Sequence, residues 1–288
     1  MLRSLNSAIS GLQNFQQEMD VIGNNIANVN TTAFKGAHVD LADSFSETLR
    51  SSSAGSAGAS GTPAMQIGLG VATQAIANRY SQGALSRTGV NTDLAVTGNG
   101  FFDVRDPVSG NEFVTRAGDF RLEENGYLVT NSGLRVQGYN DPLLSTLGDI
   151  QIDTTGMPAT SDPLSSMVSF AIDDHGQINV SLSDGSRFVR GQILMQTFSD
   201  PQSLMKEGDN LFSGIGAAGP LGGSASPTPA AAGTNGLGKI QSGALELSNV
   251  DLASEFTSLI TTQRAYQANA RVITTSDEML QELVNLKR

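Results

Sequence analysis

The sequence LNSAISGLQNFQQEMDVIGNNIANVNTT, residues 5–32, gives the N-terminal part of the chain its helical character. Apolar residues recur every seven positions in two series that are offset by three residues, which is the pattern of a helix that pairs with another helix. The pattern predicts a helix of about 25 residues, about 38 Å long. Asparagine and β-branched residues near 28–32 are expected to end it. The two series are Leu5, Leu12, Met19 and Ile26, and Ala8, Phe15, Ile22 and Val29.

A second apolar series runs through the last forty residues at the same spacing of seven. Ser248 and Asp251 precede it in an arrangement similar to a capping box, and an acid near a helix N-terminus is favoured by the helix dipole. The pattern predicts a helix of about 38 residues, roughly 57 Å long, against about 11–12 residues for an average helix. The simplest arrangement pairs the two terminal helices in a coiled coil. The series is Leu252, Leu259, Tyr266, Ile273 and Leu280, and Phe256 widens the stripe.

The polar face of the first helix leaves two interpretations open. It carries amides and hydroxyls where a solvated helix usually carries lysine and glutamate, which favours contact with other subunits. The alternative is an ordinary amphipathic helix packed on its own domain. The pattern alone supports both equally.

Between the terminal helices, apolar residues alternate with polar ones or form short runs, which is typical of antiparallel strands. Asn125-Gly126 and Asp184-Gly185 are turn signals between such runs. We therefore predict an α+β fold, in which long terminal helices pair as a coiled coil and the central region is all antiparallel β. The candidate strands are 93–97, 101–104, 111–115, 120–122, 127–130, 134–139, 168–172, 177–182 and 188–198.

Three domains follow from this pattern. Residues 1–34 and 246–288 form the helical domain, 35–80 and 214–245 form an extended linker region, and 81–213 form the β domain. The linker assignment rests on tracts rich in Gly, Ser, Ala and Pro at 51–61 and 214–238, which can bury little apolar surface. Whether 140–190 forms a separate outer domain stays open.

Composition narrows the classes of function. Charged residues make up 16% of the chain, the formal net charge is −11, and cysteine and tryptophan are absent. The negative charge disfavours nucleic-acid binding, which needs a basic surface. The absence of cysteine excludes a disulfide framework and a thiolate metal site. No apolar run reaches the roughly 18 residues that a transmembrane helix needs. The N-terminus has no secretory signal pattern, so export is expected to use another route.

Catalytic motifs are weak. Residues 214–219 match G-x-G-x-x-G, but Pro220 follows directly, where a dinucleotide site needs a helix. His175 in Asp173-Asp174-His175-Gly176 is better explained by a hairpin turn than by a metal site, and His38 suggests no catalytic role. We expect no enzyme activity, no cofactor and no metal. One alternative is a hydrolase with paired carboxylates on a β scaffold. The other is a secreted adhesin or surface-layer subunit, but that function would not explain the heptads at both ends.

A family resemblance appears in both terminal segments. Residues 19–35 resemble the N-terminal motif of the flagellar rod and hook proteins, and 247–252, 262–269 and 274–281 resemble the matching C-terminal motif. Residues 82–102, 115–120 and 198–202 are similar to the β region of this family. The motif residues are Asn24, Asn25, Ala27, Asn28, Asn249, Asp251, Gln263, Arg264 and Asn269.

The resemblance implies a structural subunit of a helical tube. The ending at 280–288 is more similar to the hook branch, and a hook protein implies a universal joint that transmits torque. The chain length is nearer that of the distal rod branch, which is the alternative assignment. The implied partners are further copies of the chain, neighbouring rod, hook-cap and hook-filament junction proteins, and the flagellar export apparatus, without nucleic acid or membrane insertion. The implied location is the bacterial flagellum, in the hook or basal body, extracellular after export without a cleaved signal peptide.

Overall fold

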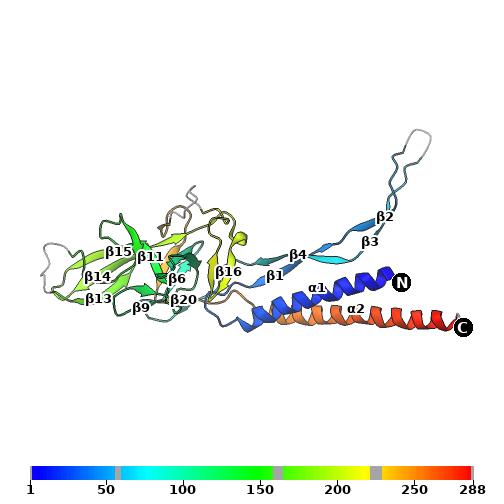
Figure 1. The fold of residues 1–288 in the computed structure, drawn as a ribbon. Coiled ribbons are helices and arrows are strands. Elements are labelled where there is room, and N and C mark those ends of the chain that lie inside the picture. Colours follow the sequence, from blue (N-terminus) through cyan, green and yellow to red (C-terminus); the bar gives the residue numbers. More distant parts are fainter. Residues whose placement is uncertain (1, 56–59, 158–164, 221–228, 287–288) are drawn as a thin grey trace. The chain divides into compact units, whose positions relative to one another are not determined.

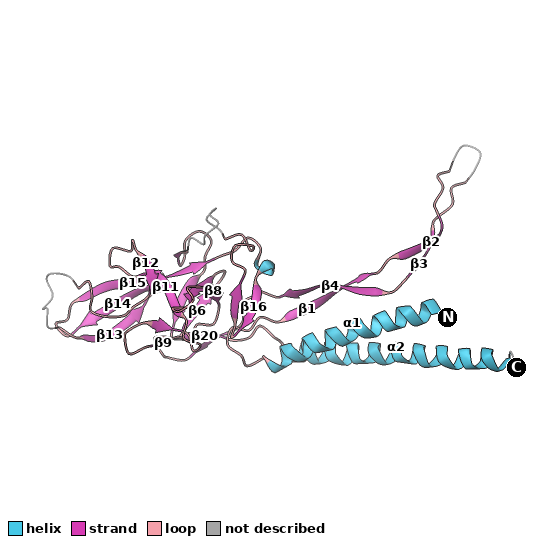
Figure 2. Ribbon diagram, viewed as in Figure 1, coloured by secondary structure: helices cyan, strands magenta, loops and turns pink. Residues whose placement is uncertain are grey.

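The computed structural model describes residues 2–55, 60–157, 165–220 and 229–286 (Figure 1). It divides into two compact units. The helical unit comprises Met1–Asn28, Gly36–Arg79 and Val250–Arg288, and the β unit comprises Val29–Lys35 and Tyr80–Asn249. The predicted fold class is confirmed, because two long terminal helices enclose, in sequence, a region of antiparallel strands (Figure 2).

The helical unit contains α1 (Leu2–Ala27) and α2 (Leu252–Leu286), which lie against each other (Figure 1). The predicted helix ends agree with these bounds to within a few residues. The long C-terminal helix begins after Asp251, whose Oδ1 accepts a hydrogen bond from the backbone N–H of Ala253 at 2.9 Å. This side chain thereby satisfies one of the first N–H groups of the helix, which have no partner within it.

A two-stranded ribbon occupies the segment that was expected to be a linker at 35–80. An isolated two-stranded ribbon is marginally stable in water, so its contacts with α1 matter. Asn14 of α1 donates from Nδ2 to the Val71 carbonyl at 2.9 Å and accepts from the Thr73 hydroxyl at 2.5 Å. The ribbon pairs β1 (Ala37–Asp43) with β4 (Val71–Asn78) and β2 (Ser46–Arg50) with β3 (Met65–Gly68).

One antiparallel sheet forms most of the β unit. Its main strand order is β13-β14-β15-β11-β7-β8-β17-β16, so residues 140–190 belong to this sheet and form no separate outer domain in the part that the structure describes. The predicted strands are confirmed. The sequence did not predict β12, β16 and β17 of this sheet. The strands are β7 (Phe101–Arg105), β8 (Glu112–Thr115), β9 (Arg121–Leu122), β10 (Leu128–Val129), β11 (Arg135–Tyr139), β12 (Leu147–Asp149), β13 (Met167–Ile172), β14 (Gln177–Leu182), β15 (Arg187–Gln196), β16 (Met205–Gly208) and β17 (Leu211–Ser213), with a short 3-10 helix at Pro201–Ser203.

The second expected linker, 214–245, also contains strands. Three of them pair with earlier parts of the β unit, and the pairing of β19 with β6 joins residues more than 140 positions apart in the sequence. Residues 56–59 and 221–228 of the two low-complexity tracts lie outside the described residues. The remaining strands are β5 (Leu85–Arg87), β6 (Leu94–Thr97), β18 (Ala230–Ala231), β19 (Lys239–Ser242) and β20 (Ala244–Glu246).

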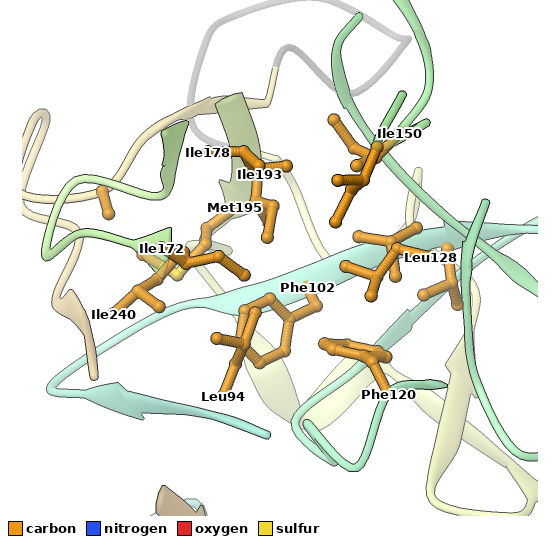
Figure 3. Packing of buried hydrophobic residues seen from close by; sticks show 14 of the residues in the cluster. Leu94, Phe102, Phe120, Leu128, Ile150, Ile172, Ile178, Ile193, Met195 and Ile240 are labelled. Carbon is orange, nitrogen blue, oxygen red and sulfur yellow. The ribbon is translucent and has the colours of Figure 1, made fainter. Parts of the chain in front are cut away.

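Two apolar cores hold the β unit together, and β7 contributes to both. Successive side chains of a strand point to opposite faces, so Phe102 enters the larger core while Phe101 enters the smaller one. Figure 3 shows Phe102 facing Phe120, with ring centroids 5.2 Å apart at a T-shaped angle. Phe101 lies 5.9 Å from the ring of Phe212 and, with Tyr80, forms an aromatic group in the smaller core.

Candidate functional site

The face of α2 that is most deeply buried is polar. Glu255, Thr262, Asn269 and Ser276 recur every seven residues; Asn269 is half-buried and the other three are buried. We call these four residues the polar line. Gly11 of α1 approaches closely, because a Cβ atom at Gly11 would lie 2.4 Å from Nδ2 of Asn269. The two helices of one chain therefore meet along small and polar residues.

The apolar seams predicted from the sequence are only partly covered in the single chain. Ile22 of α1 is buried, whereas Leu252 and Phe256 of α2 remain 40% and 49% exposed. Apolar area left in contact with water favours association with other protein surfaces. The other seam residues are half-buried, namely Leu5, Leu12, Phe15, Met19, Ile26, Leu259, Tyr266, Ile273 and Leu280.

Seven of the eight exposed large apolar residues of α2 form two patches toward opposite ends of the helix, and the eighth, Val284, is 65% exposed and belongs to neither patch. The proximal patch is Leu252, Phe256 and Ile260, with Ile260 54% exposed. The distal patch is Val272, Met279, Leu283 and Leu286, with Leu286 81% exposed. A shallow groove of about 570 Å³ accompanies the distal patch and is also lined by Thr275, Glu278 and Glu282.

Asn25, a residue of the family motif, connects three elements of the helical unit. Its Nδ2 donates to the Ala37 carbonyl at 2.8 Å and to Oε2 of Glu255 at 3.3 Å, and its Oδ1 accepts from the Ala37 N–H at 3.0 Å. The side chain is 1% exposed. A carboxamide suits this position because it donates and accepts at once.

The other motif residues have varied surroundings. Asn28 donates from Nδ2 to the carbonyl and Oδ1 of Asn24, both at 2.9 Å. Asn249 donates to the carbonyl of Ser81 at 3.2 Å. The structure thus gives local roles to Asn25, Asn28, Asn249, Asp251 and Asn269. By contrast, Ala27, Gln263 and Arg264 are exposed.

A buried ion cluster, which we call the crossing cluster, lies inside the β unit. Lys35 donates from Nζ to Oε1 of Glu246 at 2.7 Å, and Arg116 donates from Nε to Oε2 of Glu246 at 2.8 Å. The side chains of Lys35 and Glu246 are fully buried, and that of Arg116 is 3% exposed. Burial lowers the pKa of Lys35, and the hydrogen bond and charge of Glu246 oppose that effect. A buried charge must be compensated by opposite charges and hydrogen bonds, because removal from water is costly in free energy.

Backbone contacts around the crossing cluster hold the two segments that lead to the helices. The Ala33 N–H donates to the Glu246 carbonyl at 2.8 Å, and the Asn249 N–H donates to the Phe34 carbonyl at 3.4 Å. The Gly83 N–H donates to Oε1 of Glu246 at 2.8 Å. Residues 33–35 and 246–249 therefore dock side by side within the β unit. No local pattern in the sequence predicted this cluster, although Lys35 is the last residue of the N-terminal family motif and Glu246 directly precedes the C-terminal one.

Asp103 is a second buried charged group, on β7. It is 4% exposed, and no partner of its Oδ1 is found among the described residues. Burial, with a further contribution from the negative charge of Glu112, raises the pKa of Asp103 to about 7. The residue borders a cavity of about 130 Å³ that Arg105, Glu112 and Gln137 also line.

The described part of the chain holds no group of three or more His, Asp or Glu side chains placed to bind a metal ion. Within the described residues no helix combines the length and apolar character needed to cross a membrane. The hairpin turn predicted around His175 is confirmed, since Ile172 of β13 pairs with Ile178 of β14 and the His175 N–H donates to Oδ1 of Asp173 at 3.0 Å.

Comparison with known proteins relates both ends and the middle of the chain to one family. The model "Flagella basal body rod protein" matches residues 5–35, "Flagellar hook protein FlgE/F/G D1 domain" matches 95–180, and "Flagellar basal body rod FlgEFG protein C-terminal" matches 241–286. The flagellar basal-body rod protein FlgG of Bacillus subtilis is 42% identical over 288 residues, covering 100% of both chains. The chain belongs to the flagellar rod and hook family.

Two members of this family from one organism allow the similarity of this chain to the rod branch and to the hook branch to be compared. FlgG of Borreliella burgdorferi is 32% identical over 299 aligned positions, with 100% of both chains covered. The hook protein FlgE of the same organism is 27% identical, and its alignment needs 449 positions to match this chain of 288 residues. The family is structural, and the similarity to the rod branch is higher than that to the hook branch, which the sequence analysis had favoured.

Proposed function

We propose that this chain is a subunit of the distal rod of the flagellar basal body, and that it polymerises through its terminal helices. The observation that carries the choice of branch is the 42% identity to a rod protein along the whole length of both chains. The alignment with a hook protein, by comparison, leaves long stretches without a counterpart in this chain. The distal rod therefore replaces the hook as the favoured assignment.

The polymerising role is supported by what the helices leave uncovered. Eight apolar residues of α2 are at least 40% exposed, and the half-buried seam lies beside them. Fully burying an exposed side chain of this kind contributes roughly 1.5–3 kcal/mol. Most of these side chains are about half exposed, so each contributes about half of that, and together they supply several kcal/mol toward the cost of association. The neighbouring rod and hook proteins and the export apparatus are part of the proposal as partners.

The branch is tested by electron microscopy of basal bodies from cells that lack this gene. Rods that stop short of the distal end are expected, and complementation with the intact gene should restore them. A complete rod without a hook would instead favour the hook assignment. Intact, motile flagella in the deletion strain would contradict any role in the axial structure.

A further inference from the structure

We infer that copies of this chain join head to tail through α2, with the proximal patch of one copy packed on the distal patch of the next and Arg264 of the first copy paired with Glu278 and Glu282 of the second. The inference rests on the proposed polymerising function. It specifies which surfaces meet and predicts that the contact is heterologous, that is, between two different surfaces.

The two patches lie on opposite sides of the polar line that faces α1. Successive residues of an α-helix are turned by about 100°, so Phe256, one residue after Glu255, lies about 100° to one side. Met279 follows Ser276 by three residues, about 300°, and so lies about 60° to the other side. Two copies of α2 placed side by side therefore present unlike flanks to each other, the proximal patch of one toward the distal patch of its neighbour.

The charges next to the patches are complementary. Arg264 follows Ile260 by four residues and thus continues the proximal patch along the helix surface. It is exposed, and no ion pair that it forms is found within the described residues. Glu278 and Glu282 line the groove beside Met279 and Leu283 of the distal patch, and both are exposed. A cation at one patch and two anions at the other favour unlike contacts, whereas two distal patches would repel each other.

The spacing of the patches implies growth in one direction. Ile260 and Met279 are 19 residues apart, about 29 Å along the helix axis at about 1.5 Å per residue. A neighbour that covers the distal patch must then be displaced along the axis, which leaves its own distal patch open for a third copy. A heterologous contact that does not close on itself produces a helical polymer, whereas a contact between like patches stops at a dimer.

Charge reversal of the full-length chain tests the pairing. We expect Arg264→Glu, and separately the pair Glu278→Arg with Glu282→Arg, to raise the concentration needed for sedimentable polymer about tenfold or more, with the triple variant recovering most of the loss. Arg271→Glu, an exposed arginine between the patches, is the matched control and should assemble normally. Circular dichroism should show unchanged secondary structure in every variant. Absence of recovery in the triple variant would refute the pairing.

Mixing two variants tests the head-to-tail arrangement. One carries Phe256→Ser and Ile260→Ser, and the other carries Met279→Ser and Leu283→Ser. Each alone should stay monomeric, and an equimolar mixture should form dimers but no polymer, because each dimer has no intact patch left. Dimers of either variant alone, or polymer from the mixture, would overturn the inference. A wild-type chain that does not polymerise would contradict the proposed function, and with it the head-to-tail contact that rests on that function.

Discussion

Replacing the buried Asp103 by asparagine should stabilise the β unit at alkaline pH and have little effect in acid. The folded chain holds the carboxyl with a pKa of about 7, chiefly because of burial and secondarily because of Glu112, against the ordinary value of 3.8. At about 1.4 kcal/mol per pH unit, this difference corresponds to about 4 kcal/mol. Asparagine has a similar shape to the protonated carboxyl and cannot ionise, so the variant does not bear the free-energy cost of a buried negative charge.

The direction of the pH dependence follows from the raised pKa. A group whose pKa is higher in the folded state contributes stability that is fully present below the unfolded value of 3.8 and is lost as the pH rises through about 7. The free energy of unfolding of the wild-type chain should therefore fall relative to Asp103→Asn between pH 4 and pH 8. At pH 8 the variant should be more stable by up to about 4 kcal/mol, and at pH 4 the two should agree.

Urea denaturation at pH 4, 6 and 8, followed by circular dichroism of the full-length chain, measures the difference. Asp149→Asn is a matched control in the same sheet. Hydrogen bonds from Gln137 and Arg135 lower the pKa of Asp149 against the opposing effect of burial, so its contribution to stability is lost as the pH falls. A difference between Asp103→Asn and wild type that is independent of pH, or a variant less stable than wild type at pH 8, would refute the reasoning.

Three further substitutions test other contacts, each by urea denaturation. Lys35→Met leaves one oxygen of the buried Glu246 carboxylate without its partner and should destabilise the β unit by about 3–5 kcal/mol. Amide exchange should then be faster in both segments of the crossing cluster. Arg3→Met, which removes an exposed ion pair, is the control and should change stability by less than about 1 kcal/mol. Gly118→Ala places a Cβ 1.7 Å from the Leu94 carbonyl oxygen, so β6 must shift, at an expected cost of at least about 1–3 kcal/mol. Asn25→Ala removes the partner of two backbone groups of β1 and should cost about 1–3 kcal/mol in the helical unit.

Local patterns in the sequence were enough to predict the helices and most strands. The heptad spacing from Leu5 to Ile26 and from Leu252 to Leu280 predicted two long helices, and α1 and α2 have nearly those bounds. Period-two alternation and Gly-containing turns predicted the strands of the main sheet, because both signals come from neighbouring residues. The same reasoning failed at 37–78, where exposed strands with many alanines and a Ser/Gly-rich tract between them resembled a linker.

The sequence by itself determined the helical ends, the antiparallel β middle and, through the two terminal motifs, membership of the family. It could not indicate which face of α2 is buried within one chain, because an apolar stripe is a stronger signal than the polar line of Glu255, Thr262, Asn269 and Ser276. It could not indicate the crossing cluster either. Lys35 and Glu246 are 211 positions apart, and only the folded chain brings their charges to 2.7 Å. Periodicity reports how a residue relates to its neighbours in sequence, whereas burial and pairing depend on which distant segments share its space.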